Sequence, residues 1–290
     1  MRGILIKLTE NKPLSAAVRI TAVLIVKILL DFFILPFEFL RIDTSGFFDK
    51  IVNQETLSLS EWFFRSWNND IRIVAINLAV IILLLVFGFR FRKTENLRLS
   101  RHTVLIALIC LLVSTIGYSY MMYYDFTHGV FMWQDRISYL LRTIVTVAFM
   151  EEFIYRSLIT NELFHLKPSG LNIPVAIVIS AVIFGLIHID TSIFNFLRYG
   201  FAPSIGTMEQ FLYTVGCGIS WAVILYYKKD IVSLVCMHTA SNLLDYSYYI
   251  SGRPMLIGAL FVTFNVLFFV CYPVFLIFTA RKKTGVLHSG

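Results

Sequence analysis

The sequence predicts an all-α integral membrane protein. Hydrophobic residues make up 58% of its 290 residues, whereas charged residues make up only 15%. A soluble domain is usually about half apolar and about a quarter charged. The apolar residues also gather in segments of about 20 residues, the length that an α-helix needs to cross the hydrocarbon core of a bilayer. Composition and segment length therefore point to the same fold class.

Eight segments have this length and composition. They lie near residues 17–39, 71–89, 103–124, 138–164, 174–196, 208–227, 230–250 and 255–280. Most connections between them are short, and no low-complexity tract or internal repeat interrupts them. We therefore expect residues 1–290 to form a single polytopic domain of about eight transmembrane helices. No small-residue cleavage site follows the first segment, so we expect a retained span rather than a signal peptide.

Basic residues predict the orientation of the chain. The connection at 90–101 is rich in arginine and lysine, and loops of this kind usually stay in the cytoplasm. With eight spans, both termini then lie in the cytoplasm. The same rule explains the net charge of +7 without a nucleic-acid partner. We expect a multi-pass protein of a cell membrane, and the compact length without a targeting extension favours a prokaryotic one.

Residues 41–70 form the longest connection and are predicted to be extracytoplasmic. Aromatic residues lie among its charged residues: Phe47, Phe48, Trp62, Phe63, Phe64 and Trp67. We expect one or two amphipathic helices anchored at the membrane interface, with a lid over the substrate as the alternative.

The four cysteines do not indicate a disulfide framework or a cysteine zinc site, because none belongs to a C-x-x-C pair. All four lie in or near apolar segments, at Cys110, Cys217, Cys236 and Cys271. We interpret them as small buried hydrophobic residues.

Two predicted spans contain several charged residues, each of which costs about 2.5–3.5 kcal/mol to insert. In the first span, Lys27 and Asp31 are spaced i,i+4, which suggests a self-neutralising structural pair. In the fourth span, within VAFMEEFIYRSLI, Glu152 and Arg156 have the same spacing. Glu151 has no such partner in its own helix, which makes it the candidate general base. Taken alone, this span would equally fit a purely structural charge cluster.

Two further spans supply complementary polar groups. Phe184 precedes His188 by one turn in ISAVIFGLIHID, and His238 precedes Asn242 by one turn in the seventh span. Polar groups in lipid need partners, so we expect these residues to converge on Glu151.

Such a set of residues can support water attack on a peptide carbonyl. Glu151, helped by His188, would take a proton from water. His238 and Asn242 would donate hydrogen bonds to the oxyanion. We expect no metal cofactor, because the H-E-x-x-H spacing is absent. The alternative is a zinc site formed by Glu151, His188 and His238, with an open position for water.

Three short motifs in this order resemble the CPBP family. They are Glu-Glu-x-x-x-Arg at 151–156, Phe-x-x-x-His at 184–188 and His-x-x-x-Asn at 238–242, all within the predicted catalytic helices at 138–250. The family includes the eukaryotic type II CAAX prenyl protease and prokaryotic relatives tied to bacteriocin processing and self-immunity. The resemblance implies a CAAX-protease-like helical bundle with a conical intramembrane cavity.

The resemblance also implies a glutamate-type endopeptidase in which Glu151 and His188 activate water and His238 and Asn242 stabilise the oxyanion. Glu152 and Arg156 would support the site structurally or electrostatically, and Phe184 completes the second motif. The expected substrate is a membrane-associated, lipidated or bacteriocin- or signal-peptide-like chain, and the lipid bilayer is the second expected partner. The alternative is a non-proteolytic membrane partner or scaffold that regulates another membrane protein. A transporter is disfavoured, because two matching halves with broken spans are absent.

Overall fold

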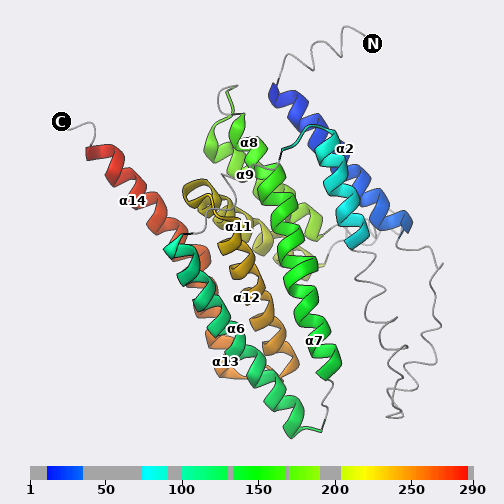
Figure 1. Cartoon of the computed structure of the whole chain (residues 1–290), viewed down its shortest axis with the longest axis vertical. Helices are drawn as coiled ribbons and strands as arrows, with labels where there is room; N and C mark the ends of the chain where they lie inside the picture. Colours follow the sequence, from blue (N-terminus) through cyan, green and yellow to red (C-terminus); the bar gives the residue numbers. More distant parts are fainter. Residues whose placement is uncertain are drawn as a thin grey trace.

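The computed structural model describes residues 12–34, 74–90, 100–129, 133–166, 170–189 and 204–286. These residues form helices and short connections, without a β-strand among them, which confirms the predicted all-α class (Figure 1). The connection at 41–70 lies outside the described residues, so its interfacial or lid role stays a prediction.

The described helices follow one another along the chain, and the label η marks a π-helix. They are α2 (Lys12–Ile34), a helix at Val74–Val86, α6 (Arg101–Thr127), α7 (Trp133–Arg142), η2 (Thr143–Phe149), η3 (Glu152–Thr160), α8 (Asn161–His165), α9 (Ile173–His188), α11 (Ile205–Lys228), α12 (Ile231–Ile250), α13 (Met255–Asn265), η5 (Val266–Cys271) and α14 (Tyr272–Val286). The residues that join α7, η2, η3 and α8 keep right-handed helical dihedral angles, so these four elements form one continuous helix.

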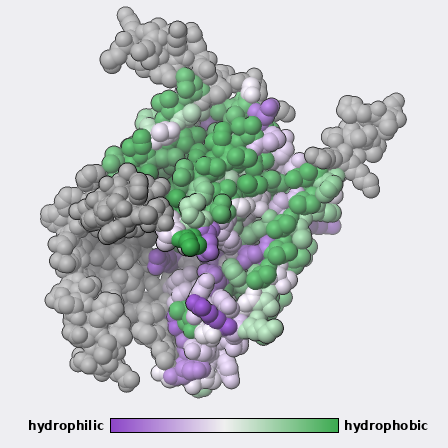
Figure 2. All heavy atoms as spheres, turned by 180° about the vertical axis from the view of Figure 1, so that it is seen from behind, coloured by the Kyte–Doolittle hydropathy of each residue, from purple (hydrophilic) through white to green (hydrophobic). Residues whose placement is uncertain are grey.

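Three described helices are long and apolar enough to cross a membrane. They are Arg101–Thr127, Ile205–Lys228 and Met255–Ala280, and two shorter apolar helices lie at Val74–Val86 and Ile173–His188. Large apolar side chains project outward from the first of them: Leu105, Leu108 and Leu112 are 57%, 58% and 61% exposed. Apolar residues also gather over the upper part of the face in Figure 2. The protein is therefore a membrane protein, and the number of eight spans remains a prediction.

Helix α12 packs between α6 and the π-helical segments η2 and η3. Figure 1 shows α12 between α6 and the long helix that begins with α7. Asp230 anchors the start of α12. Its Oδ1 accepts hydrogen bonds from the backbone N–H groups of Val232 and Ser233 at 3.0 and 3.2 Å. Its Oδ2 accepts from the Thr103 hydroxyl of α6 at 2.7 Å. This buried N-cap therefore joins the first turns of two helices.

A buried ion pair fixes the start of the long helix that carries Glu151. Arg136 of α7 donates from Nε and Nη2 to the two carboxylate oxygens of Asp125 on α6, at 2.6 and 3.0 Å. Its third nitrogen donates to the Tyr246 hydroxyl of α12 at 2.7 Å. Because such bidentate pairs hold a defined geometry, Arg136 positions α7 against both neighbouring helices.

Helix α9 lies unusually close to α11, because small residues face each other at their contact. A Cβ atom at Gly218 would lie 2.8 Å from the Cα atom of Ala181, and one at Gly185 would lie 2.5 Å from a methyl carbon of Val215. Small residues of this kind let membrane helices approach closely. The close approach places the end of α9, with His188, beside the middle of α11.

The π-helical segment η5 precedes Pro273, which has no N–H to donate to the carbonyl of Phe269. The Ser220 hydroxyl of α11 donates to that carbonyl instead. The Phe269 carbonyl, which cannot accept a hydrogen bond from the proline, thus forms a contact between two apolar helices.

We predict that Asp125→Ala lowers the stability of the protein in detergent by about 3–5 kcal/mol, because it leaves the buried Arg136 guanidinium without its charged partner. Apparent melting temperature measures this loss. Thr115→Ala is the control: this exposed hydroxyl bonds only to the Leu111 carbonyl of its own helix, so a change of less than about 0.5 kcal/mol is expected. Equal melting temperatures for both variants would contradict the structural role of the pair.

Candidate active site

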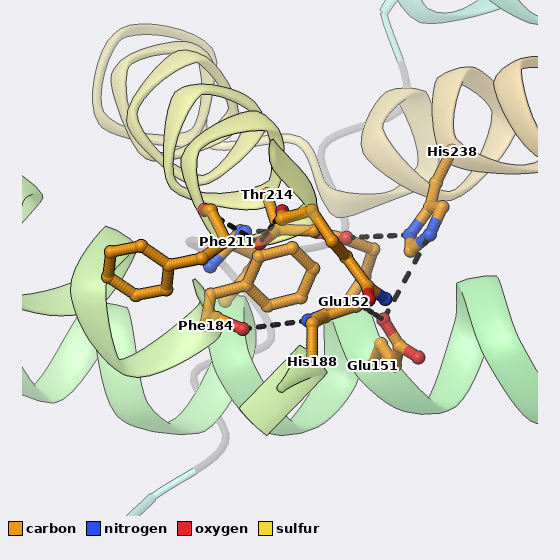
Figure 3. A network of polar contacts seen from close by, with 9 residues as sticks. Glu151, Glu152, Phe184, His188, Phe211, Thr214 and His238 are labelled. Carbon is orange, nitrogen blue, oxygen red and sulfur yellow. Dashed lines mark hydrogen bonds and ion pairs between the residues drawn. The ribbon is translucent and has the colours of Figure 1, made fainter. Parts of the chain in front are cut away.

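Glu151 and Glu152 lie at the junction of two π-helical segments in the long helix. Glu151 immediately precedes η3, and Glu152 is its first residue. The i→i+5 hydrogen bonds of a π-helix change the directions of successive side chains relative to an α-helix, and such segments are frequent at functional sites. In Figure 3, both glutamates face the same imidazole, that of His238. Neighbouring residues of an α-helix do not normally face one partner in this way.

Glu151 lies against two histidines from two other helices. Its Oε2 atom is 3.5 Å from Nε2 of His188 on α9 and 4.0 Å from Nε2 of His238 on α12. The side chains of Glu151 and His188 are 23% and 22% exposed, whereas the Oε2 atom of Glu151 is itself buried. The structure therefore brings these three residues together, as the sequence predicts.

His188 is held in one orientation by its own helix. Its Nδ1 atom lies 2.7 Å from the carbonyl oxygen of Phe184. A carbonyl oxygen only accepts hydrogen bonds, so Nδ1 carries a hydrogen and donates it. Nε2 then points toward Glu151 (Figure 3). The Phe-x-x-x-His spacing thus allows a hydrogen bond within one helical turn, and this bond orients His188.

Glu152 is fully buried and contacts two charged or polar partners. Its Oε2 atom lies 3.5 Å from Nε of Arg156, so the pair predicted from the i,i+4 spacing is present. Its Oε1 atom lies 3.0 Å from Nδ1 of His238, a contact that the sequence analysis did not predict. An ionised carboxylate only accepts hydrogen bonds, so Nδ1 of His238 donates to it. Glu152 thereby fixes which nitrogen of His238 faces Glu151.

Aromatic rings surround the guanidinium group of Arg156. Its central carbon lies 4.3 Å from the ring centre of Phe184 and 5.5 Å from that of Trp221 on α11. All three guanidinium nitrogens of Arg156 lack a hydrogen-bond partner among the described residues, and the two ring faces provide favourable cation–π contacts. The ring of Trp221 also lies 4.5 Å from that of His238. Sequence analysis missed Trp221, although a buried tryptophan in an apolar span was a usable indication.

Asn242 lies one turn after His238 on α12 and is partly buried. No hydrogen bond or ion pair joins its side chain to another residue in the described part of the chain. The neighbouring hydroxyl of Ser241 donates to the Asn265 side chain of α13 at 2.9 Å, which is a helix-packing contact. Asn242 is therefore placed near His238 by the helix, and its role as an oxyanion donor stays a prediction.

Helix α2 lies beside the helix that carries the two glutamates. Arg19 of α2 pairs with Glu162 at 3.7 Å, and Lys27, two turns further along α2, acts electrostatically on Glu151. α2 therefore adds positive charge near the site. The side chain of Asp31 lies outside the described residues, so the predicted Lys27–Asp31 pair remains a prediction.

No group of three His, Cys, Asp or Glu side chains in the described ranges is arranged to hold a metal ion. Glu151, His188 and His238 do meet at one carboxylate oxygen. The expectation of no metal cofactor and the zinc alternative both stay predictions that a metal analysis can decide.

A comparison with protein families gives one match. Residues 133–244 match the model described as "Type II CAAX prenyl endopeptidase Rce1-like". No curated protein and no solved structure matches the chain in the other two comparisons. The matched segment begins at α7 and ends within α12, so it contains all three motifs. The resemblance inferred from the motifs is thus confirmed, and residues 133–244 are similar to the Rce1-like type II CAAX prenyl endopeptidases.

Proposed function

We propose that the protein is an intramembrane glutamate-type endopeptidase that hydrolyses a peptide bond in a membrane-associated or lipidated chain. The observation that carries this proposal is the convergence of Glu151 with the Nε2 atoms of His188 and His238, at 3.5 and 4.0 Å. These groups come from three helices of a membrane protein whose matched segment resembles a protease family.

In the proposed reaction, a water molecule binds between Glu151 and His188. Glu151 takes one proton from it while the water oxygen forms a bond to the scissile carbonyl carbon. The carbonyl electron pair moves onto its oxygen and makes a tetrahedral oxyanion. Collapse of this intermediate breaks the C–N bond, and the proton on Glu151 passes to the leaving amine. The products are one new carboxylic acid and one new amine, which exchange a proton to become a carboxylate and an ammonium group, so no other reactant is needed.

His238 and Asn242 stabilise the oxyanion in this proposal. Because Glu152 accepts the hydrogen on Nδ1 of His238, the neutral imidazole has no hydrogen on Nε2. His238 therefore donates from Nε2 only when both of its ring nitrogens carry a hydrogen. Asn242 supplies a neutral amide donor beside it. Arg156 forms an ion pair with the other oxygen of Glu152 at 3.5 Å.

The first prediction concerns the general base. Glu151→Gln should reduce cleavage of a lipidated fluorogenic peptide by roughly 10²–10⁴-fold, because the amide cannot accept the proton from water. The measurement uses purified protein in lipid nanodiscs. Glu162→Gln on the same helix is the matched control and should retain activity, because Glu162 pairs with Arg19 instead of a histidine. Equal cleavage rates for both variants would contradict the role of Glu151 as general base.

The second prediction separates support of the oxyanion site from substrate binding. Glu152→Gln should lower kcat by roughly 10²-fold with little change in KM, because it removes the carboxylate that accepts the hydrogen bond from Nδ1 of His238 and orients Nε2 toward the oxyanion. A purely structural role would lower the amount of folded protein and leave kcat per folded molecule unchanged.

The third prediction concerns metal dependence. Activity should persist after treatment with a strong zinc chelator, and the purified protein should contain far less than one metal ion per chain. Stoichiometric zinc that is lost from Glu151→Gln, His188→Ala and His238→Ala alike would instead support the alternative metal site.

A further inference from the structure

A polar cavity lies away from the candidate active site. It has a volume of about 260 Å³ and is lined by Ser100, His102, Tyr227, Lys228 and Asp230. It forms where α6 and α12 begin and where α11 ends. His238 is eight residues beyond Asp230 on α12, about 12 Å along the helix, so the cavity is separate from the proposed chemistry.

The acidic residue of the cavity is already satisfied by the protein. The Asp230 carboxylate accepts hydrogen bonds from two backbone N–H groups of α12 and from the hydroxyls of Thr103 and Ser233. Both carboxylate oxygens are therefore engaged by four donors within the protein, so Asp230 has little hydrogen-bonding capacity left for a ligand. This arrangement leaves Lys228 and His102 as the residues that would contact a ligand.

Two basic side chains line the cavity. Lys228 forms no ion pair or hydrogen bond with another described residue, and its charge acts on the nearby His102. Nε2 of His102 shares a hydrogen bond of 2.6 Å with the Tyr272 hydroxyl, which holds the imidazole ring in place. The first turn of α6 adds partial positive charge from its backbone N–H groups. The cavity thus presents a lysine that has no partner among the described residues, a fixed histidine and a helix N-terminus.

The cavity also lies at a defined level relative to the membrane. Arg101 begins one candidate span and Lys228 ends another, so the cavity is at the level where both helices leave the apolar region. The basic connection at 90–101 predicts that this side is cytoplasmic. Anionic phospholipids are concentrated in the cytoplasmic leaflet, and basic pockets between membrane helices on that side bind their headgroups.

We propose that this cavity binds the phosphate group of an anionic phospholipid, with Lys228 as its counter-ion and His102 as a hydrogen-bond donor. The phosphate lies between the end of α11 and the first turn of α6. This proposal does not depend on the proposed peptidase activity, because neither its residues nor its ligand belong to the Glu151 site.

Native mass spectrometry tests the proposal on the detergent-purified full chain titrated with phosphatidylglycerol or phosphatidylcholine. The wild type should bind one phosphatidylglycerol more tightly than phosphatidylcholine. Lys228→Ala should weaken phosphatidylglycerol binding about fivefold, which corresponds to about 1 kcal/mol per lysine. Lys229→Ala is the matched control, because its ammonium group lies over the rings of Phe164 and Tyr226, 5.8 and 5.5 Å from their centres.

A second variant, His102→Phe, keeps an aromatic ring beside Tyr272 and removes both nitrogens. It should weaken phosphatidylglycerol binding. Its apparent melting temperature should fall less than that of His102→Ala, which would leave a cavity beside Tyr272. Equal losses for Lys228→Ala and Lys229→Ala, or equal binding of the two lipids by the wild type, would overturn the proposal. Glycerol phosphate that binds as tightly as phosphatidylglycerol would also overturn it, since the ligand would then be a soluble phosphate.

Discussion

The contact between the buried Glu152 carboxylate and its two partners is the interaction on which the candidate site depends. A carboxylate and a guanidinium without exposure to solvent are stable only when they are paired with each other and with further polar or aromatic groups. Glu152 meets Arg156 on its own helix and His238 on α12. Arg156 in turn lies on aromatic rings from α9 and α11. Four helices therefore meet at one ion pair, and its geometry determines where His238 lies.

Neighbouring glutamates have different environments and therefore suit different tasks. Glu152 has no exposure and is committed to Arg156 and His238, whereas Glu151 is partly exposed and faces two imidazoles. Two carboxylates placed in contrasting environments are a common way for a site to separate a proton acceptor from a supporting charge. The junction of two π-helical segments at this point directs both side chains toward His238.

Local spacing predicted much of this site from the sequence. The i,i+4 spacing predicted the Glu152–Arg156 pair, and the free-energy cost of polar groups in lipid predicted that Glu151, His188 and His238 converge. The spacing also placed Phe184 one turn before His188, but it did not predict the hydrogen bond between them. Contacts between distant residues were not predictable in this way: Glu152 with His238, Trp221 with Arg156, and Arg136 with Asp125 depend on how helices pack. No residue pattern indicated the π-helical segments at Thr143–Phe149 and Glu152–Thr160, and the number of spans cannot be decided from hydropathy alone.

The central claim is that Glu151 acts in peptide hydrolysis, and the membrane peptidome of the host tests it most directly. Cells that carry either the wild-type chain or Glu151→Gln are compared at equal protein levels. The account predicts at least one new peptide terminus, derived from a membrane-associated chain, that occurs only with the wild type. Identical peptidomes from the two strains would contradict the account and favour a protein that regulates a membrane partner without cleaving it.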